Sequence, residues 1–493
     1  MYGDKVVAIG SENLYRALAV KGENSVRVYS LVPKTYIIIL ELVGSNCQVL
    51  DIRVIDGDYV DSRLYNGTLY LVTSLGIATS GLKPYIPRVN GVEVSYDKIL
   101  VASNEYPDTY SIIYALNLDT MEDNETVFVH NHASRIYMSY TSIYLIGYVI
   151  DYSWLFNRLA DIIDNESVKE VIRDIMESSK PLIEKIAMVY DIIEDYLREK
   201  GYTVRVWIND KLETIKVNDT VEIAILPYTP WRVSWNTSIH RFIYQGLYIE
   251  YIGSDSLPGR ILDPYSIDEY NGTLRIALHN DDSDDNSLYV LDIDSMEVVG
   301  YVTGIGEGMD IYAARYIGDK AYLVTYRRTD PLYVIDLSDP ENPVVLGKLV
   351  MPGYSDYLHP LTNTLLLGIG VDDNGYIKVQ VYNVSNPLQP VIVSSLTLGS
   401  GYTSVLHEYK AFTINTRDKY FIIPYNGYTR FKNNGFYVIA YSLNGSLTVK
   451  GFIGIDRPTR SVFIEDIVYC IGSSSVVSVN ATTMEILDTI EID

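Results

Sequence analysis

The chain has 493 residues, with 39 Lys plus Arg against 63 Asp plus Glu, so its formal net charge at pH 7 is −24. Such a field repels phosphate backbones and anionic lipid, and no basic run offsets it, which excludes nucleic acid as a main partner. A hydrophobic content of 47% and a charged content of 21% exclude intrinsic disorder. No stretch approaches the roughly 18 continuous apolar residues of a membrane span, and none has the form of a signal peptide.

Short segments of alternating apolar and polar residues, separated by Gly, Asn, Asp and Pro turns, predict an all-β fold. One phrase occurs at Leu288–Met296, Leu332–Pro340 and Val379–Pro387, with separations of 44 and 47 residues. This period is the length of a four-stranded propeller blade and too long for a leucine-rich or ankyrin unit. In this interpretation the phrase is the third strand of a blade, and Pro343–Val350 is a fourth strand. Weaker copies begin near Val26, Ile113, Tyr437 and Val476.

The repeats predict a single β-propeller domain over residues 1–493, built of four-stranded blades. The count is eight, or seven if the irregular ends combine. The predicted blades are 1–56, 57–132, 133–261, 262–307, 308–353, 354–400, 401–458 and 459–493.

One segment, residues 153–201, has a helical period instead and is predicted to form a helical hairpin inserted in the third blade. Ser167 and Glu170 match a capping box at the start of the first helix. Pro181 is predicted to open the second helix, and Gly201 to end it. Such a hairpin cannot bury itself, so it packs on the propeller or binds a partner. The predicted apolar stripe consists of Val168, Val171, Ile172, Ile175, Ile186, Val189, Tyr190, Ile193 and Leu197.

The cysteines are Cys47 and Cys470, one near each end. So low a count in an extracellular chain indicates buried apolar thiols or a single disulfide. If the propeller ring closes, its first and last blades are neighbours. We therefore predict a Cys47–Cys470 disulfide, which would stabilise the fold by several kcal/mol in the entropic model.

Three compositional features indicate the habitat. The chain has 45 Tyr but only 9 Phe, and very little of the heat-labile residue Gln, which is part of the hyperthermophile pattern. It also carries Asn-x-Ser/Thr sequons, each a weak signal of N-glycosylation on an exposed turn, and Asn-Gly is in any case good turn chemistry. The predicted glycosylation sites are Asn66, Asn124, Asn165, Asn218, Asn236, Asn271, Asn383, Asn444 and Asn480.

A set of charged residues shares one position in several blades. Arg63, Asp268, Arg315 and His359 lie six residues before Leu69, Leu274, Ala321 and Leu365, which begin the second strands. The preceding strand is innermost in a propeller, so these side chains are predicted to ring the central channel, with His407 and Glu408 near the same level. Propellers place ligand contacts or catalytic groups there. The alternative is charges that pair with one another across a water-filled channel.

Metal sites are a weaker hypothesis. Asp282, Asp284 and Asn286 lie in a carboxylate-rich loop suited to calcium, as does the loop at 372–375, but neither completes an EF-hand, and solvated acidic turns explain both. His130 and His132 could serve zinc or copper, without an identified third ligand. No cofactor is assigned, although calcium stays an alternative.

Motifs of common enzymes are absent from the sequence. It contains no G-x-x-x-x-G-K-[ST] phosphate loop and no G-x-S-x-G elbow, and six His leave few candidates for a catalytic triad. A non-enzymatic role is therefore favoured.

The chain resembles a family of secreted archaeal and bacterial proteins with a C-terminal β-propeller domain distantly related to WD repeats. The similarity covers essentially the full length, and Thr-Asp-Pro-Leu at 329–332 and Tyr-Leu-His-Pro at 357–360 are its specific segments. The signal sequence and an acidic segment that usually precede the first blade are missing, which suggests a trimmed or mature chain. The matching stretches are Gly57–Arg63, Ala133–Met138, Gly259–Ala277, Ala321–Pro340 and Gly353–Pro360.

Together these features predict an extracellular or cell-surface propeller that acts as a protein-binding, glycan-binding or structural module. One alternative is a hydrolase or lyase that uses the Arg/Asp/His ring at the channel mouth. Another is a self-assembling component of a surface layer or filament.

Overall fold

The structure is a computed structural model and divides into two compact units, Met1–Arg260 and Ile261–Asp493. Their boundary lies one residue before the predicted border between the third and fourth blades. The structure describes residues 2–492 except for 13–19, 23–24, 28–31, 44–45, 78–84, 103–107, 132, 151–162, 164, 179, 181, 200–214, 218–220, 224–234, 263–264, 282, 327–329, 352 and 429–433.

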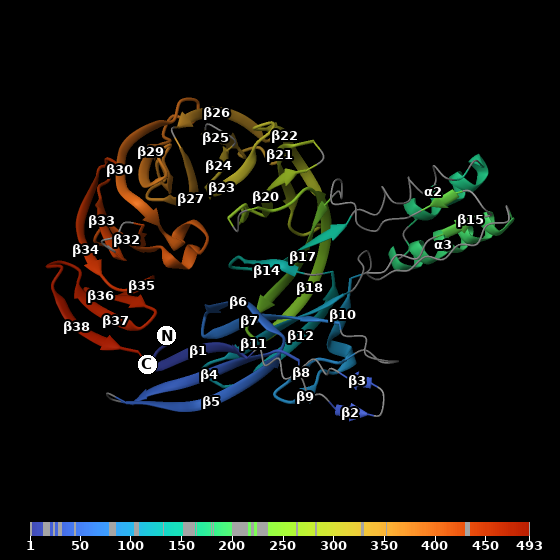
Figure 1. The fold of residues 1–493 in the computed structure, drawn as a ribbon, viewed down its shortest axis with the longest axis horizontal. Coiled ribbons are helices and arrows are strands. Elements are labelled where there is room, and N and C mark those ends of the chain that lie inside the picture. Colours follow the sequence, from blue (N-terminus) through green and yellow to red (C-terminus); the bar gives the residue numbers. More distant parts are fainter. Residues whose placement is uncertain are drawn as a thin grey trace. The chain divides into compact units, whose positions relative to one another are not determined.

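The first unit contains three larger sheets among its described residues, together with two short hairpins (Figure 1). The first sheet has the order β1 (Lys5–Glu12), β4 (Lys34–Val43), β5 (Asn46–Asp56), β8 (Arg88–Val89) and β9 (Val92–Glu93). The second has the order β10 (Ile99–Val101), β12 (Asp123–His130), β11 (Thr109–Asn117), β7 (Thr68–Gly76) and β6 (Asp58–Tyr65). The third has the order β13 (Ala133–Met138), β14 (Ser142–Ile150), β17 (Trp235–Gln245) and β18 (Tyr248–Pro258).

The short hairpins are β2 (Val20–Gly22) with β3 (Ser25–Arg27), and β15 (Ile215–Val217) with β16 (Val221–Ile223). The weak repeat copy near Val26 therefore falls in a two-stranded ribbon and not in the third strand of a blade. A single 3-10 turn, η1 (Tyr96–Lys98), precedes β10.

The second unit is more regular, and its strands follow one another in sequence order within each antiparallel sheet. The first sheet contains β19 (Ile267–Tyr270), β20 (Thr273–Asn280), β21 (Asp285–Asp292) and β22 (Val298–Ile305). The second contains β23 (Asp310–Ile317), β24 (Lys320–Tyr326), β25 (Asp330–Asp336) and β26 (Val344–Met351). The last sheet contains β35 (Pro458–Ile464), β36 (Ile467–Gly472), β37 (Ser475–Asn480) and β38 (Ile486–Glu491).

Between them lie two sets of four strands, which β30 joins into one eight-stranded sheet because Gly401 and Tyr402 at its end also pair with β32. One set contains β27 (Tyr354–Pro360), β28 (Leu365–Val371), β29 (Tyr376–Asn383) and β30 (Val391–Tyr402). The other contains β31 (Thr413–Asn415), β32 (Tyr420–Gly427), β33 (Asn434–Tyr441) and β34 (Leu447–Gly454). The short turns η2 (Ser404–Leu406) and η3 (Tyr409–Ala411) connect the two sets.

The repeated phrase does form the third strand of its sheet, in β21, β25 and β29. The Asp or Asn that ends each strand then closes the following turn. The Oδ1 atoms of Asp292, Asp336 and Asn383 accept hydrogen bonds from the backbone N–H two residues on. This is an Asx turn, for which Asp and Asn are selected by their short acceptor side chains. The phrase therefore encodes both the strand and the reversal after it.

Each inner sheet of the second unit is buried on both faces. In β24, Ala321 and Leu323 belong to a core cluster with Ala277 and Leu288 of the preceding sheet. The alternate residues Tyr322 and Val324 pack in a second cluster with the next sheet, which contributes Leu366 and Tyr382. Successive side chains of a strand point to opposite faces, so one strand connects two cores. The sheets of this unit therefore stack face to face, with β23 and β27 on the inner side of the arc in Figure 1.

Two glycines on outer strands allow the turn of the next sheet to approach closely. A Cβ atom on Gly300 of β22 would overlap the backbone carbonyl of Pro340, and one on Gly347 of β26 would lie 2.6 Å from the carbonyl oxygen of Pro387. Pro340 and Pro387 end two copies of the repeated phrase. The repeat thus also specifies where one sheet contacts its neighbour.

We expect Gly300→Ala to lower the free energy of unfolding by about 1–3 kcal/mol, because the added methyl group must displace the backbone of the Pro340 turn. The control is Gly454→Ala on β34, where no atom lies within 4 Å of the added Cβ. Chemical denaturation of both variants measures the effect, and equal stabilities would contradict the proposed close packing.

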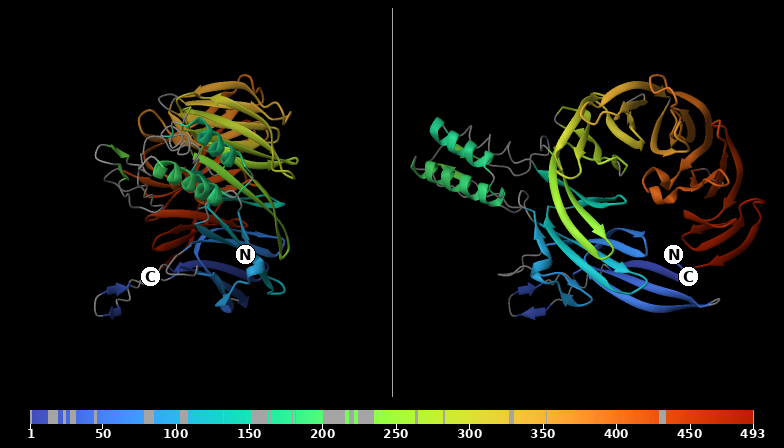
Figure 2. Two further views of the ribbon diagram at one scale, coloured as in Figure 1. Left: turned by 90° about the vertical axis from the view of Figure 1, so that its right-hand side faces the viewer. Right: turned by 180° about the vertical axis from the view of Figure 1, so that it is seen from behind.

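The predicted helical segment contains α2 (Glu166–Glu177) and α3 (Leu182–Glu199), which lie side by side in both views of Figure 2. It is inserted between β14 and β17, which are paired neighbours of one sheet. The predicted capping box is wrong, because the N-cap is Asn165, whose side chain accepts from the N–H groups of Ser167 and Val168. Pro181 and Gly201 lie outside the described residues. Ile172, Ile175, Val189 and Ile193 are buried as predicted, whereas Val171 is 48% exposed.

The predicted disulfide is not formed, since both cysteines are free thiols. Cys47 is exposed on β5, whereas Cys470 is completely buried on β36 between Val468, Val477 and other apolar side chains. Burial raises the pKa of the Cys470 thiol to about 12, because a thiolate loses its hydration there. Cys470 is thus a small residue of the apolar core. This is the buried thiol that the low cysteine count indicated as the alternative to a disulfide.

A thiol titration with a bulky disulfide reagent should therefore find one reactive group in the native protein and two after unfolding. Cys47→Ser should abolish the native reaction, whereas Cys470→Ala should leave it unchanged. An unfolded, unreduced sample without reactive thiols would mean that the disulfide forms after all.

Candidate functional site

The four charged residues of the predicted ring all lie on the first strands of their sheets. Arg63 lies on β6, Asp268 on β19, Arg315 on β23 and His359 on β27. Their partners on the second strands are Tyr70, Arg275, Tyr322 and Leu367, respectively. Three of the four belong to the second unit, and the interactions that follow relate them to one another.

Arg315 is the centre of this group. Its guanidinium carbon lies over the ring of Tyr265, 3.5 Å from the centroid, and 5.7 Å from the ring centroid of Tyr357. Its Nε donates a hydrogen bond of 2.8 Å to the carbonyl oxygen of Leu358 on β27. A cation on an aromatic face is attracted by the ring quadrupole, and the additional hydrogen bond fixes its orientation. The side chain is therefore held rigidly between two sheets.

His359 completes the wall on β27. Its Nδ1 lies 3.0 Å from the hydroxyl of Tyr357, and its ring lies 4.8 Å from that of Phe412. Burial lowers the pKa of His359 to about 3, and the neighbouring charge of Arg315 acts in the same direction. Burial also raises the pKa of Tyr357 far above its ordinary value. Both groups are consequently uncharged at neutral pH.

Asp268 has its own counter-ion. Its carboxylate is ion-paired to the buried guanidinium of Arg275, which also donates to the carbonyl oxygen of Gly318 and lies between the rings of Tyr270 and Tyr316. Burial raises the pKa of Asp268, while Arg275 and, more weakly, Arg315 oppose that shift. The negative charge of Asp268 is thus already balanced within this pair.

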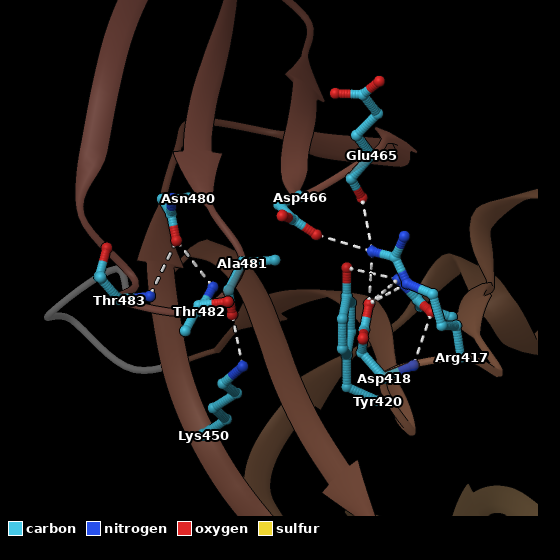
Figure 3. A network of polar contacts seen from close by, with 11 residues as sticks. Arg417, Asp418, Tyr420, Lys450, Glu465, Asp466, Asn480, Ala481, Thr482 and Thr483 are labelled. Atoms are coloured by element: carbon cyan, nitrogen blue, oxygen red, sulfur yellow. Dashed lines mark hydrogen bonds and ion pairs between the residues drawn. The ribbon is translucent and has the colours of Figure 1, made fainter.

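Arg315 differs from Arg275 and Arg417 because it makes no ion pair with a carboxylate of the described residues within 4 Å. Figure 3 shows the usual arrangement, in which Arg417 bonds to Asp418 at 2.8 Å and to Asp466 at 2.7 Å. In a chain of net charge −24, carboxylates are abundant. A rigid arginine that lacks one is therefore an available binding group for an anion.

The other predicted ring residues have different roles. His407 and Glu408 are exposed, and the Glu408 carboxylate accepts a hydrogen bond from the backbone of Lys410 at the start of η3. Arg63 belongs to the first unit, where it pairs with Asp61 at 3.1 Å and lines a pocket of about 10 Å³, room for a single water. The Arg315 cluster is therefore defined without Arg63, His407 and Glu408.

Sequence reasoning missed the aromatic part of the site. Tyr265 and Tyr357 contact Arg315, and Phe412 packs against His359. Tyr409 packs against Tyr265, with their ring centroids 5.5 Å apart. One usable signal was Tyr357 two residues before His359, since alternate residues of a strand share a face. Tyr409 and Phe412 come from a turn segment that no strand alignment could place.

Of the three predicted calcium ligands, the structure describes Asp284 and Asn286. Asp284 is exposed, but Asn286 is buried, and its amide donates to the carbonyl oxygens of Ile305 and Met309 at 2.7 and 2.8 Å. Asn286 therefore holds the β21–β22 hairpin. Asp282 and His132 lie outside the described residues, and His130 is buried against Ser111. Within the part of the chain that the structure describes, no three His, Cys, Asp or Glu side chains could hold a metal ion.

The sequons differ in accessibility. Asn66 and Asn271 adopt positive φ angles of 46° and 55° in the predicted Asn-Gly hairpin turns and are exposed. Asn165 and Asn444 are exposed as well, whereas Asn124 uses its amide to bond the carbonyl oxygen of Leu247. Asn218 lies outside the described residues. The remaining sites, Asn236, Asn383 and Asn480, are partly exposed.

We expect His359 to contribute to the pH dependence of stability. Its pKa is about 3 when folded and close to 6.5 when unfolded, so only the unfolded state binds a proton between these values. The stabilisation is complete above pH 6.5 and decreases as the pH falls below it, by at most about 1.4 kcal/mol per pH unit.

Denaturation between pH 7 and pH 4.5 tests this expectation. His359→Gln, which cannot titrate, should show a shallower decrease than the unaltered protein. Parallel pH profiles of the two proteins would show that His359 titrates normally.

Antiparallel four-stranded sheets that follow one another along the chain are typical of the β-propeller class. Residues 1–484 match the family described as Beta propeller domain, and the chain belongs to this family. It is 31% identical over 464 residues to the uncharacterized protein MJ1554 of Methanocaldococcus jannaschii, and 32% identical over 437 residues to an uncharacterized protein of Archaeoglobus fulgidus. These matches cover 89% and 85% of this chain, and 70% and 66% of the relatives.

Solved structures resemble the chain only distantly. One is Sqt1 of Chaetomium thermophilum bound to the N-terminus of ribosomal protein L10, at 11% identity and a TM-score of 0.35, over 52% of this chain and 71% of that one. Another is the C-terminal WD40 domain of Sif2, at 9% identity and a TM-score of 0.31, over 53% and 69%. Among the helices that the structure describes, none has the length and apolar character needed to cross a bilayer.

Proposed function

We propose that this chain is an extracellular, eight-bladed propeller that binds a protein or glycan of the cell surface through the first-strand face of its second unit. The observation that carries the proposal is Arg315, a fixed cation without a carboxylate partner among the described residues, on a wall of aromatic side chains. Its hydrogen bond to Leu358 joins two sheets, but its charge is only partly compensated, which leaves the guanidinium able to attract an anion.

The sheets support the blade count. The second unit has five sets of four strands, and the first has three larger sheets among its described residues. The exposed sequons at Asn66, Asn165, Asn271 and Asn444 support the extracellular location, since a glycan can be attached only to an accessible amide.

A catalytic role is the second candidate. Asp268 has a raised pKa and His359 a lowered one, and groups whose pKa values are shifted in this way often divide the acid and base roles. However, Asp268 is ion-paired to Arg275, and Nδ1 of His359 is engaged by Tyr357. Both interactions compete with a substrate, so binding is the better-supported function.

Binding can be tested by sedimenting the purified protein with the cell envelope of the producing organism. Because a rigid charged anchor at the centre of an interface dominates affinity, Arg315→Gln and Tyr265→Ala should each lower the bound fraction roughly tenfold or more. The matched control is Arg457→Gln, whose side chain is 77% exposed and pairs only with the adjacent Asp456 among the described residues.

The control variant should sediment like the unaltered protein. Binding that is insensitive to both Arg315→Gln and Tyr265→Ala would place the contact surface elsewhere. Turnover of an envelope glycan that is lost in Asp268→Asn would favour the catalytic role instead.

A further inference from the structure

The charges around Arg315 leave one positive charge to be neutralised. Asp268 and Arg275 cancel each other in their ion pair, and His359 and Tyr357 are uncharged at neutral pH. The guanidinium of Arg315 contacts one carbonyl oxygen and two tyrosine rings, none of which carries a formal charge. The guanidinium of Arg315 is therefore matched to a ligand group of charge −1.

A carboxylate fits this requirement better than a sulfate cluster or a polyphosphate. Its two oxygens lie in one plane and match the planar fork of an arginine. The chain carries a net charge of −24, and this field repels a highly charged ligand far more strongly than a singly charged one. The repulsion thus selects against polyanions, while Arg315 supplies local attraction for a single carboxylate.

The aromatic side chains beside Arg315 indicate what carries that carboxylate. Tyr409 and Phe412 are partly exposed, on the turn segment next to Tyr265 and His359. Aromatic rings pack well against the C–H face of a pyranose ring, and tyrosine hydroxyls can bond to sugar hydroxyls. An acidic peptide side chain offers only one or two methylene groups to such a wall. The surroundings therefore favour a sugar over a peptide.

We propose that the Arg315 cluster recognises the carboxylate of a hexuronic acid residue in an acidic glycan, with Tyr409 and Phe412 against the sugar ring. This proposal rests on the proposed binding function and names its ligand class. Arg315 is the anion-binding residue, and Tyr265 and the Leu358 carbonyl position its guanidinium.

Calorimetric titration with sodium glucuronate, glucose and the α-amide of N-acetylglutamate, which like glucuronate carries one carboxylate, tests the proposal. Glucuronate should bind at least about tenfold more tightly than either of the others, because only it combines the charge-assisted bidentate contact with a sugar face. Arg315→Gln should remove the preference for glucuronate over glucose. Tyr409→Ala should weaken glucuronate binding and leave binding of the N-acetylglutamate α-amide unchanged, while Arg457→Gln should alter neither.

Thermal melting of each variant shows whether it is folded, and Tyr409→Ala provides a second test if Arg315→Gln is not. Equal binding of glucuronate and glucose would overturn the carboxylate assignment. Binding of the N-acetylglutamate α-amide as tight as that of glucuronate would overturn the sugar assignment. If envelope binding depends on Arg315 while glucuronate is not preferred, the ligand class is wrong but the binding function stands. If glucuronate binds at Arg315 but the cell envelope does not bind the protein, the ligand class stands and the proposed binding of the cell surface is wrong.

Discussion

The packing of one sheet against the next is the constraint on which the second unit depends. An antiparallel sheet with apolar residues on both faces is stable only if both are covered, and β24 shows this directly, since its alternate residues enter two different cores. Close approach requires small residues where backbones meet, which explains Gly300 and Gly347 opposite the Pro340 and Pro387 turns. The repeated phrase persists because one segment supplies the strand, the turn and this contact.

The same packing creates the candidate site. Stacked sheets bring their first strands together, so Arg315 of β23 can bond the Leu358 carbonyl of β27. A long polar side chain on a buried strand must find partners, and Asp268 does so in Arg275. Arg315 instead lies on Tyr265, which compensates its charge only partly. We interpret this incomplete compensation as the basis of binding.

Part of this arrangement could be predicted from sequence. The third-strand phrases and the first-strand position shared by Asp268, Arg315 and His359 follow from alternation and period, which are local properties. The absence of the disulfide could not be predicted, because burial of Cys470 depends on which face of β36 enters the core. The same limit applies to the capping residue, where Asn165 and Ser167 are both suitable and the geometry of the helix start selects Asn165.

The sequence alone determined the all-β class, the blade period, the helical interruption and the acidic charge, since each follows from composition or from the spacing of residues near one another in the chain. The tertiary structure decided which charged residues meet. Asp268 and Arg315 occupy equivalent strand positions, yet one is neutralised by Arg275 and the other rests on Tyr265. Partners drawn from other strands and turns set this difference, and a repeat pattern carries no information about them.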